Sequence, residues 1–156
     1  MKYWSLIESS NGMNTKIWGG KLWDFLFMSI LASYPTKFDK YDKQHLKIRK
    51  HFKRMIYSLQ YTLPCSYCRK SFKKFIKKHD ITNYFKSRLD LVYWLYLLKD
   101  LVNKKLIKQE TEQYLKLSMN ITDKQELEKI KKQVFYTVPS PPFIDVLLHY
   151  EQYRST

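Results

Sequence analysis

The only two cysteines of this 156-residue chain are spaced as Cys65-Ser-Tyr-Cys68, directly after Leu63-Pro64. A disulfide across two residues closes too small a loop to restrict the unfolded chain much, so a purely structural bridge is a poor explanation. A cysteine pair at this spacing suits redox chemistry or half of a metal site.

The charges around the pair favour redox chemistry. From Lys43 to His79 the chain has twelve Lys or Arg residues and no Asp or Glu. A thiolate near a helix N-terminus and among cations is stabilised by the helix dipole and by those charges. The sequence therefore predicts a lowered thiol pKa at this motif.

Three kinds of site could use a single CxxC. A zinc site needs four ligands, and no two of the four histidines have the usual interval of three to five residues. A thioredoxin-like site places its CxxC between a strand and a helix, whereas the flanks here have helical patterns. The third kind is a helical bundle that holds the pair against a bound electron acceptor, because cysteines alone cannot make disulfides from oxygen. The residues favour this third kind, with no metal, and the other two stand as alternatives.

The composition is typical of one helical domain. The hydrophobic fraction of 44% and the aromatic fraction of 17% are too high for a disordered chain. With only 3 Gly and 5 Pro, the sequence has few of the residues that separate short strands, which favours helices.

Apolar residues that recur at intervals of three and four predict a series of helices. Their expected ranges are 17–33, about 40–61, a helix opening at the cysteine motif, about 88–106, and 122 to about 133, followed by an amphipathic piece after Pro139-Ser-Pro-Pro142. The predicted fold is all-α: a four-helix bundle with the CxxC at the start of its third helix, and a C-terminal helical appendage.

Several residues mark the expected helix ends. Pro64 should end the second helix and stand early in the third. Ser87-x-x-Asp90 and Thr122-x-x-Gln125 have the pattern of capping boxes, which open helices.

A net charge of +15 raises nucleic acid as a partner. The sequence has neither a zinc-finger spacing nor a ribonucleoprotein aromatic motif. A solvated, lysine-rich surface explains the charge without any partner, and an acidic protein or the phosphates of a cofactor would use it equally well. Nucleic acid is therefore not expected.

No membrane segment is expected either. The longest candidate apolar stretch, Phe25 to Thr36, is shorter than the roughly 20 residues of a spanning helix and contains Pro35. Residues 1–16 are mostly polar and do not resemble a signal peptide. We expect a cytoplasmic protein.

Three motifs occur in order along the chain: Trp18-Gly19-Gly-Lys-Leu-Trp23 with Tyr34-Pro35, then Leu63-Pro64-Cys65-x-x-Cys68, then Trp94-x8-Asn103-x-x-Leu106. Together they resemble the Erv/ALR family of FAD-linked sulfhydryl oxidases, over about residues 17–115. The absence of further cysteines and the basic, Tyr-rich composition are most similar to the short versions carried by large DNA viruses, for which the location would be the host cytoplasm or the virion.

The resemblance implies a four-helix bundle plus a short fifth helix, with FAD held at the mouth of the bundle. It divides the chain into a lead-in over 1–16, an FAD-binding oxidase domain over 17–115, and a C-terminal extension of unknown role over 116–156.

The resemblance also implies which residues hold FAD. On the first helix Gly19 would permit close approach, Trp23 would pack on the cofactor, and Phe27 stands where the family usually has His. On the fourth helix the family's H-N-x-V-N segment reads Lys99-Asp100-Leu-Val-Asn103, so the His-Asn pair is replaced. Lys104, Lys105 and Lys108 would contact the pyrophosphate, and Tyr114 would cover the cofactor. The implied cofactor-binding residues are Gly19, Trp23, Phe27, Lys99, Val102, Asn103, Lys108 and Tyr114.

The implied activity is a flavin-dependent thiol oxidation with Cys65 and Cys68 as catalytic residues. A protein dithiol would exchange with a resting Cys65–Cys68 disulfide at Cys65, and Cys68 would pass two electrons to the flavin, which oxygen reoxidises to give hydrogen peroxide. Because the sequence has no second pair, the protein substrate or a small thiol carrier protein must reach Cys65 directly.

Family members pair through their first two helices, so a homodimer is expected, with a surplus apolar stripe of Phe25, Met28, Phe52 and Met55. The alternative function is a basic helical module that binds nucleic acid or an acidic partner and has a non-catalytic CxxC. The departures at Phe27, Lys99 and Asp100 support that alternative.

Overall fold

The computed structural model describes residues 12–155, and most of the predicted lead-in over 1–16 lies outside them. Six α-helices and one short 3-10 helix make up this part of the chain: α2 (Thr15–Ser33), α3 (Lys43–Thr62), α4 (Ser66–Lys78), η1 (Thr82–Tyr84), α5 (Arg88–Ser118), α6 (Lys124–Val134) and α7 (Phe143–Glu151). The only β pairing within residues 12–155 is two isolated bridges. The all-α prediction is confirmed.

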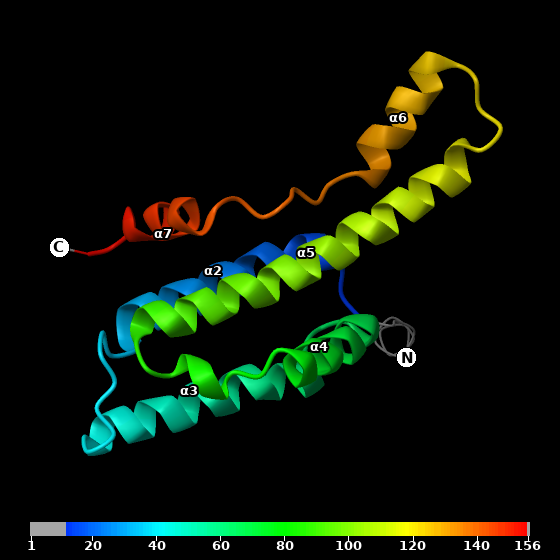
Figure 1. Cartoon of the computed structure of the whole chain (residues 1–156). Coiled ribbons are helices and arrows are strands. Elements are labelled where there is room, and N and C mark those ends of the chain that lie inside the picture. The colour runs from blue at the N-terminus through cyan, green and yellow to red at the C-terminus, as the bar shows by residue number, and fades with distance from the viewer. Residues whose placement is uncertain (1–11, 156) are drawn as a thin grey trace, which may run out of the picture.

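The bundle is formed by α2, α3, α4 and α5. Helix α2 packs along α5, and α3 packs against α4 on the other side of the core (Figure 1). Helix α5 is the common partner, because α2, α4, α6 and η1 all contact it. The CxxC lies at the start of α4, the third helix of the bundle, as predicted.

Helix ends follow the capping signals with two differences. Ser87 caps α5 by accepting a hydrogen bond from the backbone N–H of Asp90 at 3.0 Å, as the sequence predicted. For α6 the cap is Asp123 rather than Thr122. Pro64 was expected inside α4 but lies before its N-cap, which is Cys65. The extended backbone of Leu63 (ψ 136°) and Cys65 (φ −156°) makes the corner between α3 and α4, and this requires Pro64 to stay outside both helices.

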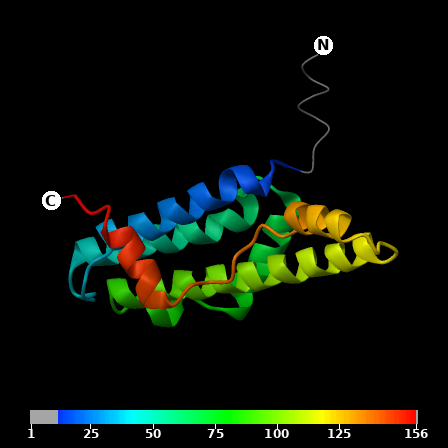
Figure 2. The same cartoon turned by 90° about the horizontal axis from the view of Figure 1, so that it is seen from above.

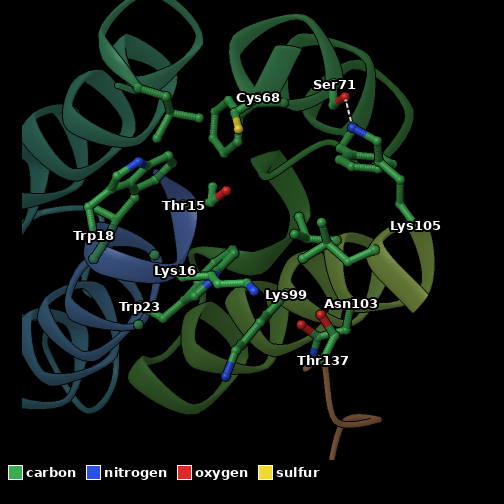
Figure 3. A pocket seen from close by; sticks show the side chains of 18 of the residues that line it. Thr15, Lys16, Trp18, Trp23, Cys68, Ser71, Lys99, Asn103, Lys105 and Thr137 are labelled. Atoms are coloured by element: carbon green, nitrogen blue, oxygen red, sulfur yellow. Dashed lines mark hydrogen bonds between the residues drawn. The ribbon is translucent and has the colours of Figure 1, made fainter. Parts of the chain in front are cut away.

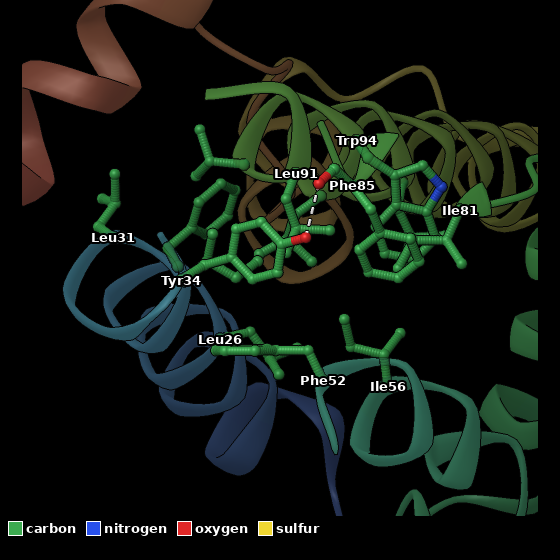
Figure 4. Close-up of a cluster of buried hydrophobic side chains, with 14 of the residues drawn as sticks. Leu26, Leu31, Tyr34, Phe52, Ile56, Ile81, Phe85, Leu91 and Trp94 are labelled. Atoms are coloured by element: carbon green, nitrogen blue, oxygen red, sulfur yellow. Dashed lines mark hydrogen bonds between the residues drawn. The ribbon is translucent and has the colours of Figure 1, made fainter. Parts of the chain in front are cut away.

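The core centres on the first half of α5. Leu91, Val92, Trp94, Leu95 and Leu98 are completely buried there. Tyr34, at the end of α2, is also completely buried, and its hydroxyl donates to the carbonyl oxygen of Phe85 at 2.6 Å (Figure 4). These contacts bring the end of α2 and the start of α5 together at the closed end of the bundle.

Trp94 of α5 is attached to the end of α4 by a hydrogen bond and by ring stacking. Its indole Nε1 donates to the carbonyl oxygen of His79 at 3.1 Å, and the two rings stack with centroids 5.4 Å apart. His79, one of the four histidines that a zinc site could have used, is therefore engaged in packing.

Helix α5 is longer than the sequence predicted. We expected it to end near residue 106, but it continues to Ser118, and α6 folds back onto the extended part. The chain then returns toward the bundle through residues 135–142, here named the return segment, and α7 packs on α2 (Figure 2). The residues from 107 to 118 contain no Gly or Pro and many good helix formers, so nothing local stops the helix.

A buried carboxylate holds the return segment. Glu110 of α5 is only 3% exposed. Its carboxylate accepts from the Thr137 backbone N–H at 3.1 Å and from the Thr137 hydroxyl at 2.6 Å. Further along, Asn103 Nδ2 donates to Ser140 Oγ at 3.0 Å, and the Tyr96 hydroxyl donates to the carbonyl oxygen of Pro141 at 2.7 Å.

No helix within residues 12–155 combines the length and the apolar character needed to span a bilayer.

Replacing Glu110 with Ala should release the return segment, because it leaves the Thr137 donors without their acceptor. Loss of these bonds should lower the free energy of unfolding by about 1–3 kcal/mol. Chymotrypsin should also cleave faster at Phe135 and Tyr136. Urea unfolding and timed proteolysis measure the two effects. Glu112→Ala, on an exposed position of the same helix, is the control, and equal behaviour of the two variants would contradict the role of Glu110.

Candidate functional site

A cavity of about 360 Å³ opens between α2, α4 and α5, and the CxxC motif borders it (Figure 3). Seven of the sequence-predicted site residues line it: Gly19, Trp23, Cys68, Lys99, Val102, Asn103 and Lys105. Trp18, Leu22, Leu26, Leu59, Leu63, Phe72, Phe75 and Leu106 give it a largely apolar wall. Apolar walls with a few polar groups are typical of sites for small molecules and cofactors.

Helix α2 contributes space as well as aromatic surface. Trp18 and Trp23 lie on the same side of the cavity, and the Trp18 Nε1 is held by the carbonyl oxygen of Met13 at 3.1 Å. A Cβ built at Gly19 would meet nothing within 4 Å, so glycine leaves room there. Gly in a helix interior costs roughly 0.5–1 kcal/mol relative to Ala. An open position kept at that cost is consistent with a ligand that needs the space.

The two cysteines occupy the corner before α4. The Sγ of Cys65 accepts from the backbone N–H of Cys68 at 3.2 Å and so caps the helix. Gly12 passes close behind, where a Cβ would lie 2.3 Å from the Pro64 carbonyl oxygen, and its φ of +128° also requires glycine. Both cysteines are half-buried free thiols, not the disulfide that we expected for a resting oxidase.

Burial determines the acidity of Cys68. It raises the pKa of this thiol to about 12, with a further upward contribution from Cys65, while Lys105 lowers it. The lowered pKa that the sequence predicted is therefore wrong for Cys68. The cause is that most of the nearby lysines point to solvent, whereas Cys68 lies in the cavity wall, where desolvation disfavours the thiolate.

Helix α5 supplies the polar and cationic side of the cavity. Lys105 donates to the hydroxyl of Ser71 on α4, which links the two helices beside Cys68 (Figure 3). Burial lowers the pKa of Lys99, and Asp24 opposes that shift.

The return segment closes one side of the same cavity. Tyr136, Thr137 and Val138 line it, and the Lys16 ammonium lies 4.1 Å from the centre of the Tyr136 ring. These residues belong to the region that the sequence assigned to an extension beyond residue 115. They carry no local motif, so no sequence signal identified them.

Phe27 lies elsewhere. It is buried beside a second cavity of about 320 Å³, which shares only Lys99 and Asn103 with the first. Tyr150 of α7 stacks on the Phe27 ring at 4.9 Å and donates its hydroxyl to Asp24 at 2.8 Å. The ring expected to stack on a cofactor is therefore covered by a side chain from the end of the chain itself.

Lys108 and Tyr114 also lie outside the first cavity. Both belong to the part of α5 beyond Leu106, where Lys108 is exposed and Tyr114 contacts Phe135, with ring centroids 5.4 Å apart. The resemblance implied a cofactor contact at each position, but α5 carries both past the cavity. Tyr136 is the C-terminal aromatic residue that reaches it.

Comparisons with known proteins identify a family and a similar fold. A family model described as the Erv1/Alr family matches residues 20–131. Among solved structures, the yeast Erv1 core is similar, with 21% sequence identity, a TM-score of 0.50, and coverage of 81% of this chain and 88% of that chain. At this identity the structural likeness supports the helical fold alone. No curated protein sequence matches the chain significantly.

The acidity of Cys68 can be tested in Cys65→Ser, which leaves one thiol. Because burial is the largest cause of the shift, ultraviolet titration should find this thiol still protonated above the ordinary Cys pKa of about 8.5. Lys105→Met should raise the Cys68 pKa further, whereas Lys104→Met, at an exposed position, should not. Thiolate formation at the ordinary pKa would contradict the burial argument.

Proposed function

The chain belongs to the Erv1/Alr family, whose model matches well over half of it, and from that premise we propose that it is an FAD-dependent oxidase that forms disulfides in protein substrates. Thiol oxidation is the activity of the family. The observation that carries the proposal for this chain is the position of Cys68 in the wall of an apolar, aromatic cavity. A cysteine pair with no acceptor beside it can only exchange disulfides.

The residues around the cavity fit a flavin. Trp18 and Trp23 offer aromatic surface, and the open position at Gly19 offers room. Lys16, Lys99 and Lys105 would serve the phosphates, and Asn103 would hydrogen-bond a polar edge. FAD would supply the two-electron acceptor that the cysteines lack and would return the electrons to oxygen as hydrogen peroxide.

The cysteines would carry out the exchange with the substrate. The exchange needs the oxidised form of the pair, which the two free thiols would reach by giving two electrons to FAD. A substrate thiolate then attacks Cys65 Sγ in the Cys65–Cys68 disulfide, the S–S bond breaks, and Cys68 leaves with the electron pair. The second substrate thiol then attacks the mixed disulfide, which frees Cys65 and completes the disulfide of the substrate. Lys105 lowers the pKa of Cys68 and so favours the charged form that this exchange creates.

The chain would act on its partner directly. These 156 residues hold no second cysteine pair, so a protein dithiol or a small thiol carrier would have to meet Cys65 itself. A single cysteine pair of this kind resembles the short members of the family that large DNA viruses carry. A cytoplasmic location, in the host cytoplasm or virion for a viral protein, stays a prediction.

Pairing of two chains through α2 and α3 is also part of the proposal. Phe25 and Met28 of α2 are exposed, so both are available to contact a second chain. Phe52 and Met55 belong to the core or pack against it, so the predicted stripe is narrower than the sequence indicated.

The division of the chain at residue 115 stays a prediction, and the cavity is lined by residues from both sides of it. Thr137 and its neighbours line the cavity, and Glu110 holds them there. We propose that the return segment is part of the FAD site.

Gly19→Leu should separate cofactor binding from folding. The leucine side chain would enter the cavity, and we expect FAD affinity to fall about tenfold or more, while the gain in helix propensity of about 1 kcal/mol keeps the protein without FAD folded. Titration with FAD followed by fluorescence, together with thermal unfolding without FAD, measures both effects. Ala32→Leu on the exposed part of α2 is the control. A wild type that takes up no FAD would reject the oxidase and favour the basic binding module.

Cys65→Ser and Cys68→Ser should each abolish oxidation of dithiothreitol, because either change removes the exchangeable disulfide. Both variants should still bind FAD, since neither enlarges or fills the cavity much. Oxygen consumption measures the activity, and the visible absorbance of the purified protein measures bound flavin. Ser58→Ala, on α3 outside the cavity, should behave as wild type. Full turnover by either cysteine variant would contradict the proposed chemistry.

A further inference from the structure

The positive charge of the chain is concentrated on two neighbouring helices. Residues 43–79 hold twelve Lys or Arg and no Asp or Glu, so this segment accounts for twelve of the fifteen net positive charges. It consists of α3, the cysteine corner and α4. The rest of the chain is close to neutral.

These charges have no salt-bridge partners within residues 12–155. Ten of the twelve side chains are exposed, the exceptions being Arg49 and Arg69. None of the twelve takes part in any of the salt bridges that the structure shows for residues 12–155. Arg69 instead donates to the carbonyl oxygen of Leu63 and so supports the cysteine corner. An uncompensated field of one sign attracts a partner of the opposite sign.

The field reaches the exchanging cysteine from the α4 side, whereas on α3 it ends at Arg54, eleven residues before Cys65. Helices α3 and α4 pack on each other and meet at the corner that holds Cys65 (Figure 1). On α4 the exposed lysines recur at helical spacing, beginning with Lys70 and continuing through Lys73, Lys74, Lys77 and Lys78. Lys70 is five residues beyond Cys65, about 8 Å along the helix axis. That distance is within the screening length of about 8–10 Å at physiological salt.

Aromatic side chains flank the same corner. Tyr61, near the end of α3, is 72% exposed, and Tyr67, between the cysteines, is 65% exposed. Tyrosine offers apolar contact area together with a hydrogen-bonding group, a combination that is common where proteins bind one another. The corner therefore combines apolar contacts close to the sulfur with positive charge that begins at Lys70 on α4.

We infer that the outer faces of α3 and α4 form a docking surface for a protein dithiol in acidic surroundings, which selects the substrate of the proposed oxidase. The inference rests on the proposed function, because a partner that exchanges with Cys65 must carry thiols. Nucleic acid would match the charge but has no thiol to oxidise. Complementary charge chiefly accelerates encounter and disfavours partners of like charge, so the surface acts on the second-order rate constant.

The test uses the full chain loaded with FAD and two synthetic peptides that share a Cys-x-x-Cys sequence. One peptide has glutamates on both sides, and the other has glutamines. The acidic peptide should be oxidised with a kcat/KM about tenfold or more above that of the neutral peptide at low salt, and the difference should shrink at high salt. Dithiothreitol, a small uncharged dithiol, should show no salt dependence of comparable size.

A matched pair of variants locates the effect. Lys70→Glu, Lys73→Glu and Lys74→Glu together should remove or reverse the preference for the acidic peptide. Lys116→Glu, Lys124→Glu and Lys129→Glu together change the net charge equally, but on exposed positions of α5 and α6, and should keep the preference. Both triple variants should oxidise dithiothreitol at the wild-type rate.

The outcomes separate the two proposals. If the wild type does not oxidise dithiothreitol, the oxidase itself is rejected. If it oxidises dithiothreitol but treats the two peptides alike, or if both triple variants lose the preference equally, the docking surface is rejected. Binding of a short DNA duplex that the α4 variant loses, with no peptide preference in the wild type, would also reject it and assign the surface to nucleic acid.

Discussion

The position of the site depends on one contact, in which Trp94 both stacks on His79 and donates a hydrogen bond to it. It attaches the end of α4 to the buried first half of α5 through a stacked ring pair and an indole hydrogen bond. Cys68 precedes His79 by eleven residues, and Lys105 follows Trp94 by eleven residues. Each path is about 16 Å along a helix. Because the two helices are antiparallel, the path back along α4 and the path forward along α5 lead the same way from this attachment, so Cys68 and Lys105 come level. The Lys105–Ser71 hydrogen bond then joins the two helices at that end.

The same arrangement explains why the cavity lies where it does. Helix α4 reaches α5 through the Trp94 contact at one end and the Lys105 contact at the other, and α2 packs along α5 beside them. Bulky side chains fill the closed end around Tyr34, whereas Gly19 leaves the other end open. The return segment then covers part of the opening, held by a carboxylate that has almost no contact with solvent. The bundle thus provides three walls, and residues far along the chain provide the fourth.

Local patterns in the sequence predicted the helices, and the family resemblance implied seven of the residues that line the cavity. Gly19, Trp23 and Asn103 could be placed because the resemblance assigned them to regular helices, on which the period fixes the face that a residue occupies. The covering of Phe27 by Tyr150 could not be predicted, since 123 residues separate them and no motif links the two. The same is true of Glu110 and Thr137, whose contact depends on α5 continuing past residue 106. The acidity of Cys68 was mispredicted because charge can be counted in a sequence, whereas burial cannot.

Charge and burial have opposite effects on the proposed exchange, one at each cysteine. Positive charge around the corner attracts an incoming thiolate toward Cys65. The sulfur that must leave is Cys68, and burial raises its pKa, which makes it a poorer leaving group. Lys105 is the cation that lowers this pKa, and its hydrogen bond to Ser71 keeps it beside α4. The numerous lysines of α3 and α4 would therefore govern how fast a substrate arrives, while one lysine of α5 would govern how readily the disulfide opens.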